Sequence, residues 1–427
     1  MKTKSEKRNP WLWVPSSYFM EGLPYVMVMS VSVIMYKKLN ISNTDIALYT
    51  SWLYLPWVIK PLWSPFVDII KTKRIWIVLM QLVIGGGLAG VALTLHAPDF
   101  FRYSLAFFWL LAFSSATHDI AVDGFYLHGL STHEQAFFVG IRSTFYRIAM
   151  LSGQGLFVMI TGILEKSKGS IPDAWSYSFL VVTVVFICFA IYHQIILPYP
   201  LTDIERKEKN AKIIFKEFAE TFVLFFKKEK IWLILFFILF YRLGEAQLVK
   251  IAPPFLLDSR TVGGLGFSTE DVGFIYGTVG VAALVVGGLL GGFIASKKGL
   301  KFWIWWMLVA INVPDILYVY MSTVQPESFI IVCCCVAIEQ FGYGIGFTAF
   351  MLYLMYASEG KYKTAHFAIA TGFMALGMMI PGMISGWLQE QLGYQMFFVW
   401  VFVATIPAFI ITKFISIDPE FGKKKTA

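Results

Sequence analysis

Long apolar runs separated by short polar segments dominate the chain. A helix that crosses a bilayer needs about 20 mostly apolar residues, and the pattern predicts twelve such spans in the 427 residues. The predicted spans are residues 11–36, 44–69, 75–96, 103–127, 136–161, 175–198, 231–257, 270–296, 302–322, 328–357, 363–388 and 393–414. The sequence therefore predicts an all-α polytopic membrane protein.

The longest polar segment lies between the sixth and seventh spans and divides the chain in two. We predict an N-terminal six-helix bundle over 1–198, a cytoplasmic linker over 199–230, and a C-terminal six-helix bundle with a basic tail over 231–427. Apolar residues between Ile213 and Phe226 would share one face of a helix, as in an amphipathic helix on the inner leaflet. A plain linker is the alternative.

The two halves also resemble each other faintly at an offset of 227 residues. Lys71 matches Lys298 and Thr144 matches Thr371 at this offset. Together with the six-plus-six division, these matches are typical of transporters built from two pseudo-symmetric halves.

Composition supports the membrane assignment. Hydrophobic residues make up 57% of the chain and charged residues 15%, whereas soluble domains carry about 25% charged residues. This composition excludes a disordered chain and a disulfide scaffold. The four cysteines all fall inside apolar spans, so they are interpreted as small buried side chains, and no metal or cofactor is predicted.

The net charge of +8 raises the question of nucleic-acid binding. With the N-terminus inside, 24 of the 35 Lys and Arg residues fall in inner segments and only six in outer loops. This asymmetry follows the positive-inside rule and predicts that both termini are cytoplasmic. The basic residues are therefore topology determinants, and nucleic acid is excluded as a partner.

Eleven charged residues lie inside the predicted spans, away from their ends. Each costs about 2.5–3.5 kcal/mol at the centre of a membrane helix, so these side chains should face a cavity or a partner. The five bases and six acids are Lys60, Arg142, Arg147, Arg242, Lys250, Glu21, Asp119, Asp123, Glu245, Asp315 and Glu339.

Spacing predicts which of these charges meet. Asp119 and Asp123 are four residues apart and share a helix face, and Arg142 enters the next span to a similar depth. We expect these three to cluster, and Arg242 to lie near Glu245. Static ion pairs between helices are the alternative interpretation.

The one acid in excess predicts a proton carrier, because a buried carboxylate without a full partner favours its protonated form. The sequence places this carrier at Glu21 or Glu245. Trp57 and Trp63, near Lys60, are suited to stack against a sugar ring.

The loop from Asp68 to Arg74 follows the second span and carries three basic residues. We interpret it as a cytoplasmic gate latch. A simple positive-inside anchor is the alternative.

The twelve spans, the central loop and the basic loops after spans two and eight resemble the major facilitator superfamily. In that fold the first, fourth, seventh and tenth helices line a cavity. Most of the buried charges lie on the corresponding spans of this chain: Glu21, Asp119, Asp123, Arg242, Glu245, Lys250 and Glu339.

Several motifs are similar to those of AmpG-type muropeptide permeases. They are the segments 60–68 (KPLWSPFVD) and 115–123 (SATHDIAVD), the pair Tyr146-Arg147, and the segment 241–246 (YRLGEA). Glu339-Gln340 matches more loosely. Two residues depart from the family pattern, because Glu21 stands where a small polar residue is usual and His118 where Gln is usual.

The resemblance implies proton-coupled import of anhydro-muropeptides, with or without peptide, across the bacterial inner membrane for cell-wall recycling. We expect a monomer with a small sugar-peptide substrate, protons and membrane lipid as partners. Alternatives are a facilitator for another solute, such as an acyl-CoA-like compound or a sugar acid, or a membrane enzyme acting on lipid-linked sugars.

These considerations assign roles to particular residues. The predicted substrate-binding residues are Lys60, Arg147, Arg242, Glu339, Gln340, Trp57 and Trp63. The predicted proton-coupling residues are Glu21, Glu245, Asp119 and Asp123, and the predicted gating residues are Asp68, Arg74 and Arg142.

Overall fold

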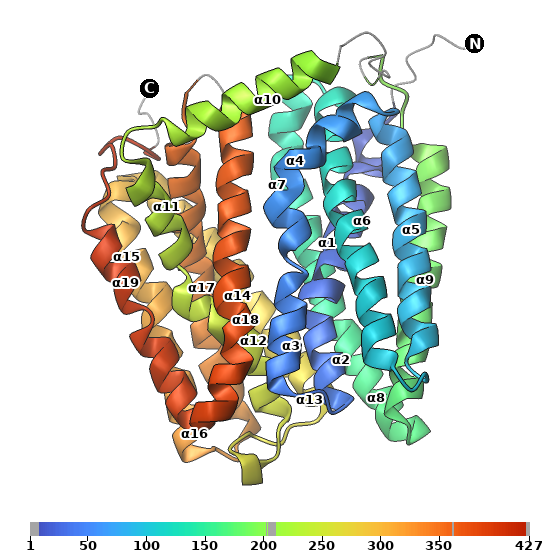
Figure 1. Cartoon of the computed structure of the whole chain (residues 1–427), viewed down its shortest axis with the longest axis vertical. Coiled ribbons are helices and arrows are strands. Elements are labelled where there is room, and N and C mark those ends of the chain that lie inside the picture. The colour runs from blue at the N-terminus through green and yellow to red at the C-terminus, as the bar shows by residue number, and fades with distance from the viewer. Residues whose placement is uncertain (1–7, 202, 204–210, 361–362, 424–427) are drawn as a thin grey trace. The chain divides into compact units, whose positions relative to one another are not determined.

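The computed structural model describes residues 8–201, 203, 211–360 and 363–423. The side chains of residues 65, 68, 69, 132, 136, 139, 211–218 and 364 are not described. Part of the predicted linker, both ends of the chain and the side chain of Asp68 thus lie outside the described part. The described residues form helices throughout the chain, which confirms the all-α fold (Figure 1).

Helices of the first half of the chain follow one another through short connections. They are η1 (Pro10–Leu12), α1 (Val14–Val26), η2 (Met27–Val31), α2 (Ser32–Lys38), α3 (Asn43–Trp52), α4 (Leu55–Ile69), α5 (Lys73–Thr94), α6 (Phe100–Gly129), α7 (Thr132–Met150), η3 (Leu151–Phe157), α8 (Val158–Lys168) and α9 (Ile171–Ile196).

Helix α10 (Ala211–Phe226) lies in the predicted linker. The helix expected there is present, and its position on a membrane surface stays a prediction.

The second half repeats this helical organisation. Its helices are α11 (Ile231–Phe240), α12 (Leu243–Leu257), η4 (Arg260–Val262), α13 (Thr269–Val272), η5 (Gly273–Gly280), α14 (Val281–Lys298), α15 (Leu300–Asn312), η6 (Val313–Asp315), α16 (Ile316–Val324), α17 (Phe329–Ala357), α18 (Lys363–Val403) and α19 (Ile406–Thr412).

Ten helical runs among the described residues are long and apolar enough to cross a membrane. The predicted span 44–69 is not among them because a turn at Leu53 and Tyr54 divides it into α3 and α4. The last two predicted spans form one run, Ala365–Thr412. Gly393 has a positive φ of 71° and breaks the helical geometry between the two, at the place where the sequence predicts their boundary.

The helices gather into two compact units. Unit 1 comprises residues 1–35 and 59–216, and unit 2 comprises residues 36–58 and 217–427. In unit 1, α5 packs against both α6 and α9, and α1 packs against α7 (Figure 1). In unit 2, α17 packs against α14 and α15, and α18 packs against α3 and α12. Helix α3 therefore belongs to unit 2, although it precedes most of unit 1 in the sequence.

Polar residues at the first turns explain where several helices begin. A side-chain oxygen at the N-cap accepts a hydrogen bond from a backbone N–H that has no partner inside the helix. Ser42 caps α3 in this way and Ser170 caps α9. Ser131 and Glu134 form a reciprocal capping box at the start of α7.

Two breaks within apolar spans position charged side chains. Helices α11 and α12 are separated at Tyr241 and Arg242, and Arg242 has non-helical dihedral angles. The 3₁₀ turn η6, which contains Pro314, separates α15 from α16 and ends at Asp315. Broken helices of this kind are tolerated in membrane proteins where neighbouring elements satisfy the freed backbone groups.

Close helix packing in unit 2 depends on glycines of α17. A Cβ atom at Gly342 would lie 2.0 Å from the carbonyl oxygen of Ala310 on α15. A Cβ atom at Gly344 would lie 2.2 Å from the carbonyl oxygen of Leu284 on α14. Only glycine permits these two backbone approaches, so α17 can pack tightly against both neighbours.

Candidate functional site

Two clusters of ionisable side chains form the candidate site, one in each unit. In unit 1, Asp123 on α6 contacts Arg142 on α7 and Tyr18 on α1. Arg142 Nη1 lies 3.0 Å from Asp123 Oδ1, and the Tyr18 hydroxyl donates to the same oxygen at 2.9 Å. Arg142 also donates to the Tyr18 oxygen at 2.9 Å. The side chain of Asp123 is 46% exposed, so this pair borders solvent-accessible space.

Asp119, one turn earlier on α6, pairs with Lys60 on α4. The expected group of Asp119, Asp123 and Arg142 is present, and Lys60, which was not expected in it, is the base that contacts Asp119. Glu21 on α1 is buried beside Asp119, and its Oε2 has no hydrogen-bond partner in the described part of the chain. Unit 1 therefore groups three acids with two bases.

Arg147 lies in α7, slightly more than one turn after Arg142. Its Nη1 is buried and has no hydrogen-bond partner among the residues that the structure describes. The indole nitrogen of Trp63 on α4 is likewise buried without a partner, and its ring lies 5.6 Å from that of Phe113. Trp57 and Lys60 lie on the same helix. A guanidinium and an indole with unused donors suit a polar ligand that carries a carboxylate.

Arg242 lies at the break between α11 and α12 in unit 2. Its guanidinium donates to the hydroxyl of Tyr343 on α17 and lies 5.1 Å from the centre of the Tyr343 ring and 5.0 Å from that of Phe347. Glu245, three residues later, interacts electrostatically with Arg242. The expectation that Arg242 and Glu245 lie near each other is consistent with this arrangement.

The second cluster joins Glu245 on α12, Asp315 at the end of η6 and Glu339 on α17. One carboxylate oxygen from each of these buried residues lies within 4.8 Å of the other two. Gln340 donates through Nε2 to both oxygens of Glu339, at 3.2 and 3.1 Å. Glu245 and Glu339, which the sequence predicted to have different roles, therefore belong to one cluster together with Asp315.

The predicted gating residues occupy different environments. Arg74 in α5 donates to the carbonyl oxygens of Gln194 and Leu197 and lies 4.1 Å from the centre of the Tyr199 ring. It therefore binds the end of α9 inside unit 1. Asp68 lies in α4, and its side chain is outside the described residues. Arg142 belongs to the cluster with Asp123.

Sequence reasoning missed three partners of these clusters. Tyr18 lies three residues before Glu21, and this helical spacing could have identified it. Asp315 was recognised as a buried acid but not as a neighbour of Glu245 and Glu339. Tyr343 had no signal, because nothing in its local sequence links it to Arg242.

A third polar group consists of glutamine, histidine and serine side chains. The amide nitrogen of Gln81 on α5 lies 3.0 Å from Nε2 of His118 and 2.8 Å from Nδ1 of His193. Ser16 Oγ lies 2.9 Å from the other ring nitrogen of His193. His118, which departs from the family pattern, is therefore hydrogen-bonded inside the helix packing of unit 1.

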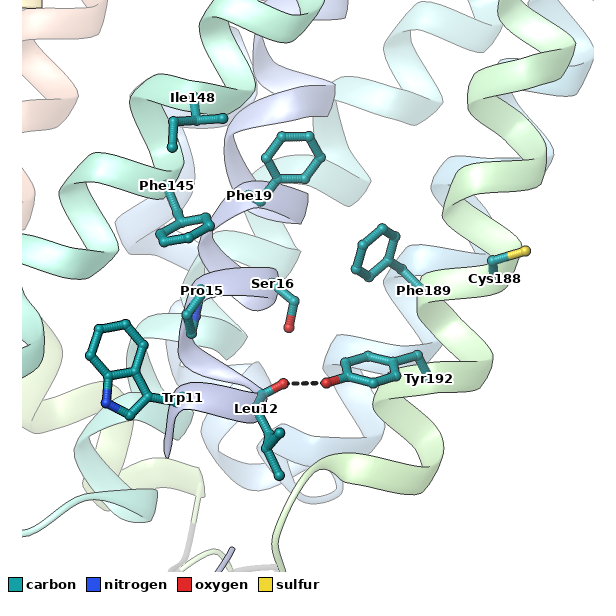
Figure 2. Close-up of a pocket in the computed structure, with 10 residues that line it drawn as sticks. All are labelled: Trp11, Leu12, Pro15, Ser16, Phe19, Phe145, Ile148, Cys188, Phe189 and Tyr192. Atoms are coloured by element: carbon teal, nitrogen blue, oxygen red, sulfur yellow. Dashed lines mark hydrogen bonds between the residues drawn. The ribbon is translucent and has the colours of Figure 1, made fainter. Parts of the chain in front are cut away.

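An apolar hollow of about 650 Å³ lies on unit 1 between η1, α1, α7 and α9, and Ser16 of the third polar group lines it (Figure 2). Aromatic side chains such as Trp11, Phe145 and Phe189 dominate its lining. The Tyr192 hydroxyl donates to the carbonyl of Leu12 at 2.5 Å. None of the predicted site residues lines this hollow, so it is not suited to a charged solute.

Comparison with known proteins identifies the family. The profile of the Major Facilitator Superfamily matches residues 16–365. The chain belongs to the Major Facilitator Superfamily. Membership of this family, together with the transporter relatives described next, indicates a multi-pass membrane transporter rather than an enzyme.

Relatives within this superfamily confirm the resemblance to AmpG-type permeases. The chain is 26% identical over 412 residues to the AmpG 4 protein of Rickettsia conorii, covering 92% of this chain and 94% of that protein. It is 24% identical over 400 residues to the anhydromuropeptide permease of Escherichia coli K12, covering 92% of this chain and 77% of that protein.

Solved structures of other transporters share the fold. A D-xylose–proton symporter superposes with a TM-score of 0.73 and 12% identity, covering 96% of this chain and 98% of that one. A nucleoside transporter superposes with a TM-score of 0.72 and 12% identity, covering 95% and 99%. The predicted major facilitator fold is therefore confirmed.

Proposed function

We propose that this chain imports anhydro-muropeptides, with or without the stem peptide, into the cytoplasm of a bacterium by symport with protons, driven by the proton gradient. The substrate class is supported by similarity along 92% of the chain to a protein named anhydromuropeptide permease and by the motifs around Lys60, Asp119 and Arg147. The proposed location is the inner membrane, with both termini in the cytoplasm.

The observation that carries the proton coupling is the charge count in unit 1. Three acids, Glu21, Asp119 and Asp123, lie with two bases, Lys60 and Arg142. One carboxylate therefore lacks a compensating cation, and binding of a proton neutralises its charge. Glu21 is this carrier, because Asp119 and Asp123 each contact a base. Glu245, the other predicted carrier, lies in the second cluster.

Arg147 and Lys60 are proposed to bind the carboxylates of the solute. A guanidinium binds a carboxylate through two parallel hydrogen bonds, and Arg147 Nη1 is buried with its hydrogen-bonding capacity unused among the described residues. Trp63 would contact the sugar rings. Arg242 and Gln340 are the corresponding candidates in unit 2.

Uptake of labelled anhydro-muropeptide into proteoliposomes tests this proposal. We expect accumulation when an inward proton gradient is imposed, and only equilibration when a protonophore removes the gradient. Efficient uptake of a sugar acid or an acyl-CoA-like compound in place of the muropeptide would contradict the substrate assignment.

The Glu21→Gln variant tests the proton carrier. We expect it to exchange substrate across the membrane but to lose accumulation against a gradient, because Gln cannot release a proton. Glu327→Gln, which changes an exposed acid, is the matched control and should accumulate substrate normally. Gradient-driven accumulation by Glu21→Gln would exclude Glu21 as the carrier.

A further inference from the structure

The acids of unit 2 meet the geometric requirement for one shared cation. Glu245, Asp315 and Glu339 are 2%, 1% and 1% exposed, and their nearest carboxylate oxygens all lie within 4.8 Å of one another. Ligands on opposite sides of a cation with oxygen distances of about 2.4 Å lie about 4.8 Å apart. A single ion can therefore contact all three carboxylates.

Unused oxygens point to a missing ligand at this place. Glu245 Oε2 and both carboxylate oxygens of Asp315 have no hydrogen-bond partner within the described ranges. The hydroxyl of Tyr318, one turn after Asp315, is fully buried and interacts with the carboxylate of Glu339. Buried carboxylate oxygens normally have hydrogen-bond partners, so the unused oxygens of Glu245 and Asp315 are free to bind a ligand.

The net negative charge of the cluster also requires a cation. Arg242 is the base beside Glu245. The other base on α12, Lys250, instead donates to Thr50 Oγ1 at 3.0 Å and lies 5.2 Å from the centre of the Tyr54 ring. Three acids thus face one base, with the phenols of Tyr276 and Tyr318 as the other titratable groups nearby. At least one further cation is needed to neutralise the group.

The ligand chemistry selects the type of ion. The cluster offers oxygen ligands, three carboxylates and one phenol, whereas zinc sites use mainly imidazole and thiolate. Calcium takes six to eight oxygens. Three carboxylates and one phenol hold seven, but both oxygens of Glu339 already accept hydrogen bonds from Gln340, so five remain. A small monovalent cation with modest coordination needs fits the number of ligands best.

We propose that Glu245, Asp315, Glu339 and Tyr318 form a sodium-binding site in unit 2. Na⁺ compensates one of the two excess negative charges, and a proton shared among the carboxylates compensates the other. The site is independent of the identity of the transported solute and of the proton carrier in unit 1. In this site Glu245 and Glu339 bind the same ion, whereas the sequence alone predicted proton coupling for Glu245 and substrate binding for Glu339.

Thermal unfolding of the purified detergent-solubilised protein tests this site without any solute. An ion that binds the folded state raises the unfolding midpoint in a saturable way. We expect NaCl to raise the midpoint relative to equal concentrations of choline chloride and KCl. The absence of a sodium-selective rise, or a rise with CaCl₂ or MgCl₂ but not with NaCl, would overturn the proposal.

Two variants locate the effect. Asp315→Asn should abolish the sodium response, and the exposed-acid control Glu327→Gln should keep it. If Asp315→Asn does not fold, Tyr318→Phe retains the ring and should weaken the apparent sodium affinity about 10-fold or more. An unchanged sodium response in Tyr318→Phe and in a folded Asp315→Asn would exclude this location.

Binding of ²²Na⁺ to the same proteins provides a second readout. Muropeptide uptake that persists in a protein that binds no sodium would leave the proposed function intact.

Discussion

At the scale of single residues, the clusters show that the partner of a buried charge depends on a few ångströms of packing. Asp119 and Asp123 lie one turn apart on α6, yet one contacts Lys60 and the other contacts Arg142 and Tyr18. Arg142 thereby contacts Asp123 and Tyr18. This division of bases leaves Glu21 as the acid without a directly contacting cation.

The Asp123–Arg142 pair provides a test of function against a purely structural role. Because the side chains of Asp123 and Arg142 are 46% and 33% exposed, the pair is not fully buried and its contribution to stability should be about 1 kcal/mol or less. We expect Arg142→Gln to lower the thermal midpoint only slightly and to reduce substrate uptake at least tenfold. The measurements are thermal unfolding in detergent and uptake into proteoliposomes.

A large loss of stability would give a different interpretation. Removing one partner of a fully buried ion pair costs about 3–5 kcal/mol. If Arg142→Gln unfolds at a much lower temperature while the remaining folded protein transports normally, the pair is a static link between α6 and α7.

At the scale of elements, helix breaks and close helix packing position the charges of unit 2. Arg242 lies at the break before α12, and Asp315 lies at the end of η6. Helix α17 supplies Glu339 and reaches both α14 and α15 through its glycines. The position of Glu339 relative to Asp315 therefore depends on how closely α17 approaches α15.

Substituting a glycine of α17 tests this dependence. Gly342→Leu should destabilise the protein by about 1–3 kcal/mol or more, because its Cβ would lie 2.0 Å from the backbone oxygen of Ala310. Gly292→Leu on α14 is the matched control, since nothing lies within 4 Å of a Cβ atom at Gly292. Thermal midpoints and the yield of monodisperse protein measure the difference. Equal behaviour of the two variants would show that α17 does not need this close approach.

At the scale of the whole molecule, the chain combines a shared fold with its own set of buried charges. Superposition on a xylose symporter and a nucleoside transporter at 12% identity shows that helix packing of this kind does not require a particular sequence. Function within the superfamily therefore has to be argued from the residues of the clusters.

Topology is a prediction that belongs to this scale. The positive-inside distribution predicts that the connection between α8 and α9 is outside and that the end of α14 is inside. In a variant without native cysteines, Ser167→Cys should react in intact cells with a membrane-impermeant maleimide, and Ser296→Cys should react only after permeabilisation. Both serines are exposed, so access is decided by the membrane. The reverse labelling pattern would contradict the predicted orientation.

The sequence by itself determined the class of protein and most helix positions. Hydrophobic runs act through residues close together in the chain, so the sequence predicts most helices and the boundary between the spans 363–388 and 393–414. Motifs such as the segment 115–123 pointed to the AmpG-type relatives that the comparisons also show. The set of buried charges was likewise visible, because a charged residue within an apolar run is conspicuous.

Only the tertiary structure decided which of these charges meet. Lys60 contacts Asp119, which lies 59 positions later in the sequence. Asp315, Glu245 and Glu339 lie on three different elements and meet in one cluster. Such contacts depend on helix breaks, glycine-mediated approaches and the rotation of each helix about its axis. None of these follows from local hydropathy, because an amphipathic pattern shows which face is polar but not which side chain lies opposite.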